Sequence, residues 1–423
     1  MTINARPRVL MLVHRIPLAP DRGDRIRSYH LLHYLAARAD VWLGTLADEP
    51  CDQAAVADLK SLCQRISIEP LTKTRWWHAA VRLAAGGAAT SGLFHSARLH
   101  SDVARWLTET EFDAVVVFCS SMLAYAPHPR TGCPVVVDLV DVDSEKWSDY
   151  AARSHGLARW LFRCESRRLR QLEQSLESRS TAVTLVSEAE AELLRPIAPR
   201  ARVIAVPNGV NLDYFHPQSL PAESEQANTC VFVGALDYRA NIDGLTWFAN
   251  EVWPGVRSAV PAARLALVGR APTAAIERLG ELPGIEVVGG VPDVRPYLAR
   301  GAVAIVPLRI ARGIQNKVLE AAAMQKATVV SPAALEGLGL VADRDLLVAD
   351  SPAAWQQQLA RALSDANLRQ RLGRAARDFV EKHHSWDACL QPFAELLGIK
   401  EHISATRSAL ATDHTAPLAE ARR

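Results

Sequence analysis

Short apolar runs alternate with helix-length amphipathic stretches along most of the chain. Such runs are typical of strands that are buried on both faces of a sheet, and the stretches between them fit helices that cover those faces. The pattern therefore predicts an α/β protein built on parallel sheets. The expected strands of the first half are 9–13, 41–46, 114–119, 134–140, 182–186 and 203–206. Those of the second half are 230–233, 265–268, 286–288, 303–306 and 328–330.

The two sets of strands predict two domains, because each half has enough strands for a sheet of its own. Between them lies the turn segment Pro207-Asn208-Gly209, and a polar stretch over 218–228 follows it. Turn residues and a loss of apolar side chains are typical of a linker. We expect an N-terminal domain over 1–207 and a C-terminal domain over 208–384.

Composition narrows the class of protein further. The 48 basic residues nearly balance the 46 acidic ones, so the chain as a whole is not suited to bind nucleic acid. Seven cysteines without a C-x-x-C pair fit neither a disulfide framework nor a zinc site and favour a reducing cytoplasm. The first apolar segment, 9–13, is too short for a signal peptide or a membrane span. Apolar residues are sparse and aperiodic over 401–423, where we expect a disordered tail.

Two glycine segments follow predicted strands. Gly23 opens a helix after strand 9–13, where backbone N–H groups can face an anion, although a glycine can also simply begin a helix. The dinucleotide pattern G-x-G-x-x-G is absent there, which argues against a hydride-transfer enzyme. The second segment, after strand 303–306, contains Gly313 and leads into a helix with Lys317 and Glu320.

This second segment is the strongest chemical signal in the sequence. Gly313 allows close approach of the backbone, while the helix dipole and Lys317 favour a phosphate-bearing ligand. Glu320 falls on the same helix face as Asn316 and Lys317 by its spacing. The alternative is that Lys317 and Glu320 form an exposed helical ion pair.

With these segments, the chain resembles retaining glycosyltransferases of the GT-B fold, family 4 of the sequence classification, over residues 6–398. The motifs that carry the resemblance are Pro207-Asn-Gly-Val-Asn211 with Phe215 and Pro217, Phe232-Val-Gly234, Leu267-Val-Gly-Arg270, Gly289-Gly-Val-Pro-Asp293 and Lys317-Val-Leu-Glu320. The resemblance implies two Rossmann-like domains facing a central cleft, the first binding the acceptor and the second a nucleotide sugar. It also implies a helix over 385–400 that crosses back to the first domain.

A closer resemblance is to the sugar transferases associated with exosortase (PEP-CTERM) exopolysaccharide systems. Its motifs are Val13-His14-Arg-x-Pro17 with Gly23-Asp24, Asp138-x-x-Asp141-x-Asp143-Ser144-x-Lys146-Trp147, and Pro307-Leu-Arg309 with Gly313-Ile-Gln-Asn-Lys317. The likeness implies transfer of a sugar from a nucleotide diphosphate to a glycan or lipid-linked acceptor, without a cofactor or a metal.

The resemblance also assigns site residues. Lys317 would contact the donor diphosphate with Arg312 as a second cation, and Glu320 would bind the ribose hydroxyls. The implied nucleotide-sugar contacts are Gly23, Gly234, Arg239, Arg270, Val291, Gly313, Asn316, Lys317 and Glu320. The catalytic candidates are Lys317, Arg312, Asp24, His95 and Asp141.

Two positions depart from the family pattern. Arg312 stands where the family commonly has the first of two glutamates, and the chain has Phe118-Cys119-Ser120-Ser121 in the place, just after a strand, where many members have a histidine. The departures motivate two alternatives: a catalytically weak scaffold that binds a nucleotide sugar within a polysaccharide assembly, and an epimerase acting on the nucleotide sugar itself.

Three further groups of residues each have more than one possible role. The acidic run Asp138, Asp141, Asp143 and Glu145 could bind a metal, cap the end of a strand, or supply an acceptor-binding group or base from Asp141 or Asp143. His95 is a solvated loop residue or a reserve catalytic candidate. The stretch 153–170 has six arginines and one glutamate among apolar residues, and Lys73-Thr-Arg75-Trp76-Trp77 adds a similar patch. These patches fit an anionic membrane surface or a solvated helix face.

Overall fold

The computed structural model describes residues 6–18, 23–49, 53–219, 225–311 and 313–399. The described chain divides into two compact units. Unit 1 extends to Pro207 and takes in the segment that begins at Leu390, and unit 2 is Asn208–Cys389. The segments 220–224 and 401–423, for which we expected linker and disordered tail, lie outside the described residues.

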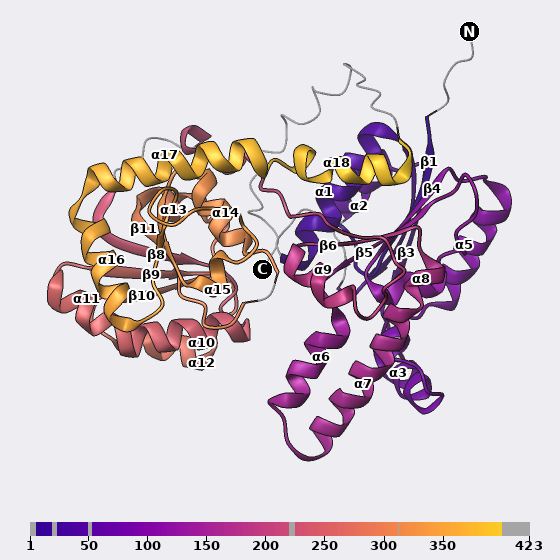
Figure 1. The fold of residues 1–423 in the computed structure, drawn as a ribbon, viewed down its shortest axis with the longest axis horizontal. Helices are drawn as coiled ribbons and strands as arrows, with labels where there is room; N and C mark the ends of the chain where they lie inside the picture. Colours follow the sequence, from indigo (N-terminus) through magenta and orange to yellow (C-terminus); the bar gives the residue numbers. More distant parts are fainter. Residues whose placement is uncertain (1–5, 19–22, 50–52, 220–224, 312, 400–423) are drawn as a thin grey trace, which may run out of the picture. The chain divides into compact units, whose positions relative to one another are not determined.

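Unit 1 is built on a parallel seven-stranded sheet with the order β3-β2-β1-β4-β5-β6-β7 (Figure 1). Its strands are β1 (Arg8–Val13), β2 (Asp40–Ala47), β3 (Arg65–Pro70), β4 (Ala114–Phe118), β5 (Val135–Val140), β6 (Ala182–Leu185) and β7 (Val203–Ala205). Its helices are α1 (Gly23–Arg38), α2 (Gln53–Leu62), α3 (Arg75–Ala84), α4 (Ala89–Leu93), α5 (Ala97–Glu109), η1 (Ser120–Tyr125), α6 (Asp143–Ala152), α7 (Gly156–Gln174), α8 (Leu176–Arg179) and α9 (Glu188–Leu194).

Unit 2 is built on a parallel six-stranded sheet with the order β10-β9-β8-β11-β12-β13. Its strands are β8 (Gln226–Val233), β9 (Arg264–Val268), β10 (Ile285–Gly289), β11 (Gly301–Val306), β12 (Ala327–Val330) and β13 (Leu347–Val348). Its helices are η2 (Pro217–Ser219), α10 (Arg239–Trp247), η3 (Phe248–Val252), α11 (Trp253–Ala259), α12 (Ala274–Glu277), η4 (Arg278–Glu281), α13 (Arg295–Arg300), α14 (Asn316–Ala323), α15 (Pro332–Leu335), α16 (Pro352–Ser364) and α17 (Ala366–His383). The last described helix, α18 (Trp386–Leu397), begins in unit 2 and ends in unit 1.

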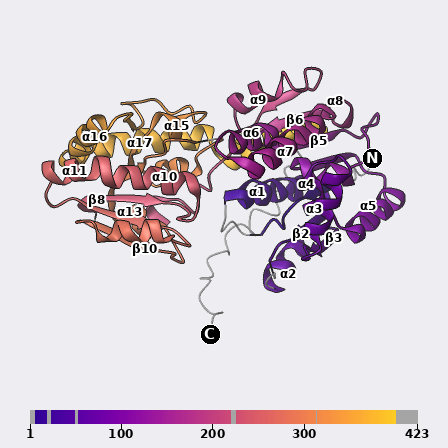
Figure 2. The same cartoon turned by 90° about the horizontal axis from the view of Figure 1, so that it is seen from below.

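Helices cover both faces of each sheet, which explains why strands such as β4 and β11 are apolar at every position. In unit 2, α10, α11 and α16 pack on one face through Leu245, Trp253 and Trp355. Leu298 of α13 and Ala321 of α14 belong to the cluster on the other face (Figures 1 and 2). Every residue of β4 and of β11 is buried. A strand that is buried on both faces gains stability from apolar side chains at all its positions.

The prediction of an α/β protein with two parallel sheets is confirmed, and all eleven expected strands are present with shifted ends. Two strands were not predicted from the sequence. The edge strand β3, Arg-Ile-Ser-Ile-Glu-Pro, is mostly half-buried and alternates polar with apolar residues, so it has no apolar run. Strand β13 has only two residues.

The polar stretch over 218–228 was wrongly predicted to be linker along its whole length. Residues 226–228 belong to β8, and Gln226 pairs with Gly301 of β11. The first residues of β8 are exposed, so a polar sequence is compatible with a strand there.

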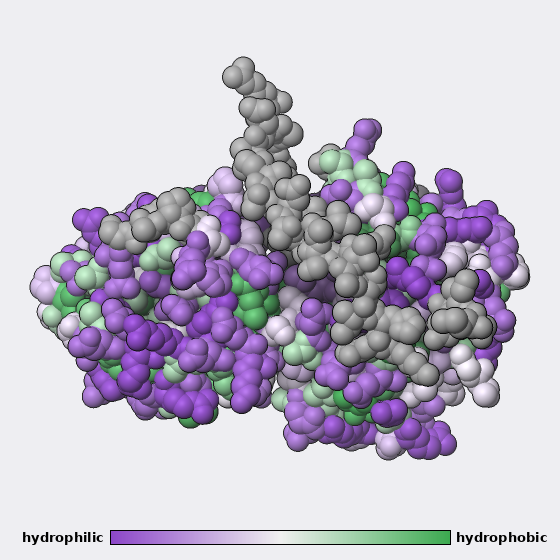
Figure 3. Space-filling model, turned by 90° about the horizontal axis from the view of Figure 1, so that it is seen from above, coloured by the Kyte–Doolittle hydropathy of each residue, from purple (hydrophilic) through white to green (hydrophobic). Residues whose placement is uncertain are grey.

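One face of the molecule is mainly polar. The face seen in Figure 3 is mostly hydrophilic, with small scattered apolar patches, as is usual for folded proteins. Among the described residues, no helix combines the length and the apolar character needed to cross a membrane.

The strand orders define one switch point in each sheet. The order reverses between β1 and β4 in unit 1 and between β8 and β11 in unit 2. In open α/β sheets, ligands bind outside the carboxyl ends of the strands at such points. The loops after these four strands are therefore the first place to look for a functional site.

Candidate functional site

The switch point of unit 2 brings together residues of three separate segments. Gly234 follows β8 directly, and a loop over 307–315 leads from β11 into α14. A Cβ atom on Gly234 would lie 3.1 Å from Cε of Lys317 and 3.2 Å from Nδ2 of Asn241. A side chain at this position would press on Lys317 and Asn241, which would have to shift by a few tenths of an ångström.

Lys317 is the central cation of this group. Its Nζ atom donates to Oδ1 of Asn241 at 3.2 Å and to Oε1 of Gln315 at 3.4 Å. It also lies 5.8 Å from the centre of the Phe232 ring. Burial lowers the pKa of Lys317 to about 8, although the nearby Glu320 opposes this shift. An anion bound beside Lys317 would oppose this shift and favour the charged form of its amine.

Glu320 lies one helical turn after Lys317, as its spacing predicted. Burial raises the pKa of its carboxyl group to about 7, and the charge of Lys317 limits the shift. Among the described residues, this carboxylate has no hydrogen-bond or ion-pair partner. Both side chains are half-buried, which argues against the alternative of an exposed, solvated ion pair.

The loop before α14 contains a glycine in a left-handed backbone conformation. Gly313 has a φ of 64°, in the left-handed region that favours glycine. No side chain caps the N-terminus of α14, where Gln315 occupies the N-cap position. Oδ1 of Asn316 accepts a hydrogen bond from Nδ2 of Asn208 at 3.2 Å. Arg312 lies outside the described residues.

The residues expected near the nucleotide lie at the ends of neighbouring strands. Arg270 is exposed just after β9, and its carbonyl oxygen accepts a hydrogen bond from the N–H of Leu236 at 3.0 Å. A Cβ atom on Gly290 would lie 3.4 Å from Cα of Arg270. Val291 is half-buried against the cluster that contains Val268. These residues border the end of the sheet.

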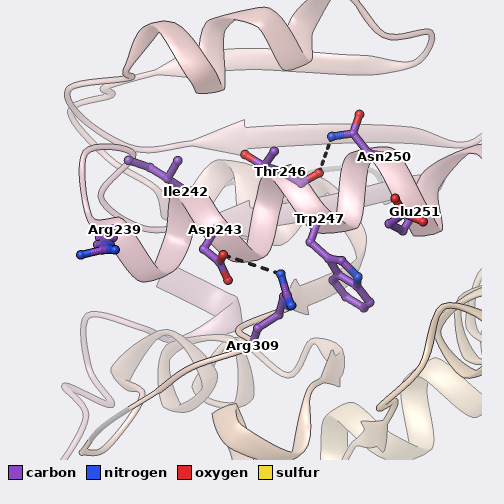
Figure 4. A pocket seen from close by; sticks show the side chains of 8 residues that line it. All are labelled: Arg239, Ile242, Asp243, Thr246, Trp247, Asn250, Glu251 and Arg309. Atoms are coloured by element: carbon purple, nitrogen blue, oxygen red, sulfur yellow. Dashed lines mark hydrogen bonds and ion pairs between the residues drawn. The ribbon is translucent and has the colours of Figure 1, made fainter. Parts of the chain in front are cut away.

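Arg239 lies elsewhere, at the start of α10. Together with Arg309 it lines a shallow hollow on the outer face of that helix (Figure 4). Nη1 of Arg309 lies 3.7 Å from Oδ1 of Asp243, and its guanidinium group is 6.0 Å from the Trp247 ring centre. The other lining residues are Ile242, Thr246, Asn250 and Glu251. Asn241, which contacts Lys317, is not among them.

The switch point of unit 1 places a histidine beside a cysteine. Val13 pairs with Phe118, so the next residues of the two strands, His14 and Cys119, are neighbours. Nε2 of His14 lies 4.0 Å from Sγ of Cys119, and its ring stacks on Phe118 at 5.9 Å. Burial raises the pKa of the Cys119 thiol well above its ordinary value, so the thiol stays protonated. Sequence reasoning missed His14, although a histidine directly after the first strand was a usable signal.

The acidic run of unit 1 serves several separate contacts. Asp138 is buried in β5 and accepts a hydrogen bond from Nε of Arg27 at 2.7 Å. Asp143 is the first residue of α6 and accepts from Oγ of Ser120 at 2.7 Å, and burial raises the pKa of its carboxyl group. Asp141 lies half-buried in the loop between them. In the described part of the chain, no group of three or more His, Cys, Asp or Glu residues is arranged to hold a metal ion.

The remaining candidates of unit 1 are spread out. His95 is exposed between α4 and α5, and its ring meets the His78 ring edge-on at 5.3 Å. Partial burial, followed by the positive charge of neighbouring groups such as His78 and Arg82, lowers the pKa of His95. Gly23 and Asp24 are the first residues of α1, and the side chain of Asp24 is outside the described part of the chain.

Both halves of the chain match known protein families. Residues 22–209 match the family described as glycosyl transferase 4-like domain. Residues 227–365, which lie inside unit 2, match the family described as glycosyl transferases group 1. No curated protein sequence matches the chain significantly.

Solved structures resemble the chain over nearly its whole length. Sucrose-phosphate synthase from Thermosynechococcus elongatus is 16% identical with a TM-score of 0.66, and the match covers 92% of this chain and 98% of that one. WaaG, a glycosyltransferase involved in lipopolysaccharide biosynthesis, is 16% identical with a TM-score of 0.62 over 93% and 99% of the two chains. HepE from Anabaena, solved with UDP and glucose, is 14% identical with a TM-score of 0.60 over 93% and 99%. Identities this low show a shared fold.

Proposed function

We propose, from the premise that the chain carries the two Rossmann-like domains of the GT-B glycosyltransferase fold, that it is a retaining glycosyltransferase. It moves a sugar from a nucleotide diphosphate to a glycan or lipid-linked acceptor. The observation that carries the proposal is the half-buried pair of Lys317 and Glu320 at the switch point of unit 2, beside the left-handed Gly313. This arrangement offers a cation for a diphosphate and an acceptor oxygen for hydroxyl groups.

The donor would be bound by complementary charge. Lys317 and the N-terminus of α14 meet the diphosphate, because N–H groups and a cation both stabilise phosphate oxygens. The carboxylate of Glu320 accepts hydrogen bonds from the two ribose hydroxyls. Arg312 supplies a second cation, while Gly23, Gly234, Arg270, Val291 and Asn316 complete the proposed donor contacts. The solved complex of HepE with UDP-glucose makes a uridine diphosphate sugar the first donor to test.

Transfer would proceed at one face of the sugar. The bond from the anomeric carbon to the phosphate oxygen breaks while the acceptor hydroxyl bonds to the same face, and the hydroxyl proton passes to the departing phosphate. Lys317 and Arg312 stabilise the charge that grows on the diphosphate, where preorganised cations lower a barrier most. Asp24, Asp141 and His95 are the candidates for orienting the acceptor or the donor sugar.

The pH dependence of kcat/KM for the donor follows from the same pair. Binding needs charged Lys317, which is lost as the pH rises through about 8, and ionised Glu320, which is lost as the pH falls through about 7. We therefore expect a narrow, bell-shaped plot of kcat/KM against pH, in which both limbs reflect the coupled titration of Lys317 and Glu320. Initial rates measured from pH 5.5 to 9.5 check it, and Glu320→Gln is expected to remove the acidic limb. A flat profile in this range contradicts the assignment.

Metal independence is a separate expectation. If cationic side chains meet the diphosphate charge, excess EDTA is expected to leave donor turnover nearly unchanged. The measurement is the rate of nucleoside diphosphate release with and without the chelator. Turnover that disappears with EDTA and returns with Mn²⁺ or Mg²⁺ would mean that Asp141 and Asp143 have to be reconsidered as metal ligands.

A donor screen followed by product analysis tests the proposed function. Thermal shift of the purified chain against a panel of nucleotide sugars identifies the donor through the stability that binding adds. Sugar transferred to an acceptor or to water, with retained configuration, supports the enzyme. Binding without turnover favours the scaffold, and a new sugar still attached to its nucleotide favours the epimerase.

We further propose a role in exopolysaccharide biosynthesis, with the protein in the cytoplasm and peripheral on the inner face of the cytoplasmic membrane. A lipid-linked acceptor would be available at that face. The basic stretch over 153–170 supports the location, because clusters of arginine are attracted to anionic lipid. The structural likeness to WaaG, itself involved in lipopolysaccharide biosynthesis, is consistent with a surface glycan as the product class.

A further inference from the structure

Large exposed apolar side chains gather on two neighbouring helices of unit 1. On α3, Trp76 is 64% exposed and Trp77 is 71% exposed, and Val81 lies on the same face as Trp77. On the first turns of α7, Leu157 is 72% exposed and Trp160 is 59% exposed. We call these five residues the aromatic edge. Exposed apolar residues are ordinary when they are single, but a concentration of them marks an interaction surface.

Hydrogen bonds join α7 to the segment that follows α3. Nη1 of Arg168, in α7, donates to the carbonyl oxygen of Gly86, just after α3. Glu165 of α7 accepts from the N–H groups of Ala89 at 2.7 Å and Thr90 at 2.8 Å. The segment after α3 is therefore held against the middle of α7. Figure 1 shows α3 and the α6–α7 hairpin projecting from the same side of the unit 1 sheet, and Figure 2 looks onto that side.

Packing also fixes the hairpin that presents the edge. Phe162 of α7 meets Trp147 of α6 at 5.3 Å and Tyr150 at 6.2 Å between ring centres. The inner face of α7 buries Leu169 and Glu173. Because the inward residues of α7 are already packed, the outward Trp160 and Leu157 have no protein surface to cover within the described unit.

Basic side chains surround the edge. Arg159, Arg163 and Arg167 are exposed on α7, and Lys73 is exposed just before α3. The Arg75 guanidinium lies 5.6 Å from the Trp76 ring centre. Arg170 of the same stretch is paired with a carboxylate at the surface, since its Nη1 lies 3.0 Å from Oε1 of Glu145. The surface thus combines tryptophan with flanking cations.

We propose that the aromatic edge inserts into the interfacial layer of an anionic phospholipid bilayer. Tryptophan favours that layer because its ring is apolar while its N–H can bond to headgroups and water. The flanking arginines lie at the depth of the phosphates, which selects anionic lipid. The inference rests on the proposed peripheral location and goes beyond it. Apolar insertion, and not charge alone, holds the protein on the membrane.

Liposome co-sedimentation tests the inference. With vesicles of phosphatidylglycerol and phosphatidylcholine, the triple variant Trp76→Ser, Trp77→Ser, Trp160→Ser is expected to partition at least about tenfold less than the wild type, by the apolar area it no longer buries. Val341→Ser in unit 2, where the side chain is 46% exposed, is the matched control and binds as the wild type. Unchanged thermal unfolding of the triple variant shows that it is folded, since its altered side chains are exposed.

The salt dependence of vesicle binding distinguishes the contribution of the arginines from that of the tryptophans. Reversing Arg159, Arg163 and Arg167 to glutamate is expected to weaken binding in low salt, and the difference shrinks at 0.5 M NaCl, where the Debye length is only about 4 Å. The tryptophan effect persists at high salt. The inference is overturned if the wild type does not sediment with the vesicles, or if the triple variant sediments as the wild type does.

Enzyme assays keep this test independent of the proposed function. Donor turnover to water or to a soluble acceptor is expected to be the same in the triple variant and the wild type, because the three tryptophans are exposed and none of them is a proposed donor or acceptor contact. Vesicle binding without any turnover would leave the membrane surface intact and reject the transferase. Turnover without vesicle binding would support the transferase and reject the membrane surface.

Discussion

Replacing Lys317 by alanine is expected to lower kcat by about 10²-fold or more, with a smaller rise in the KM for the donor. The ammonium group meets charge that grows between the bound donor and the transition state, and such a contact acts mainly on the chemical step. The magnitude follows from the loss seen when one preorganised donor to a developing anion is removed. Steady-state kinetics with saturating acceptor and varied donor measure both constants.

Glu320→Ala is the matched comparison in the same helix. A ribose hydroxyl gains no charge during transfer, so this variant is expected to raise the donor KM and to change kcat little. If Lys317→Ala keeps nearly the wild-type kcat at saturating donor, Lys317 does not meet the leaving group. That role would then fall to Arg312 or to a residue of unit 1.

The second large effect is on stability. Asp138→Asn is expected to lower the free energy of unfolding by about 3–5 kcal/mol, because it breaks a buried ion pair from one side while both groups stay desolvated. Arg27 is 2% exposed and Asp138 is fully buried, with Nε and Oδ2 2.7 Å apart. Nη1 of Arg27 also donates to the carbonyl oxygen of Val206 at 2.8 Å, so the pair anchors the last residues of unit 1. Urea unfolding at pH 7 measures the change.

An exposed ion pair of the same unit is the control. Nη1 of Arg195 and Oε1 of Glu188 are 2.6 Å apart on the surface, and Glu188→Gln is expected to change stability by less than about 1 kcal/mol. The double variant Arg27→Met, Asp138→Leu removes both charges and is expected to recover part of the loss. Equal small effects of Asp138→Asn and Glu188→Gln would contradict a buried, unsolvated pair.

The sequence was most informative where chemistry and local structure lie within one short segment. Gly313, Lys317 and Glu320 fall within a single loop and the first turns of α14, so helical spacing alone placed the last two on one face. The same local logic found the buried strands, whose apolar runs reflect coverage on both faces. It missed β3, because an edge strand buries less and alternates polar with apolar residues.

Contacts between distant segments were beyond such reasoning. The partners Arg27 and Asp138 are 111 residues apart, and His14 meets Cys119 across two strands. The acidic run suggested a metal site as one alternative, but Asp138 forms an ion pair with the buried Arg27 of α1. Likewise Asn241 contacts Lys317, whereas Arg239, two positions away on the same helix, faces the outer hollow.

By itself, then, the sequence determined the two parallel sheets and the composition of the loop at α14, because periodic burial and backbone freedom are properties of neighbouring residues. Tertiary structure decided which strands flank each switch point, and therefore that Gly234 lies against Lys317. It also decided that the tryptophans of α3 and α7 have exposed rings, and that the segment after α3 is hydrogen-bonded to α7. The burial of a side chain, and its charged state, depend on the residues that pack against it. These residues come from distant segments, which are brought together by the order of the strands.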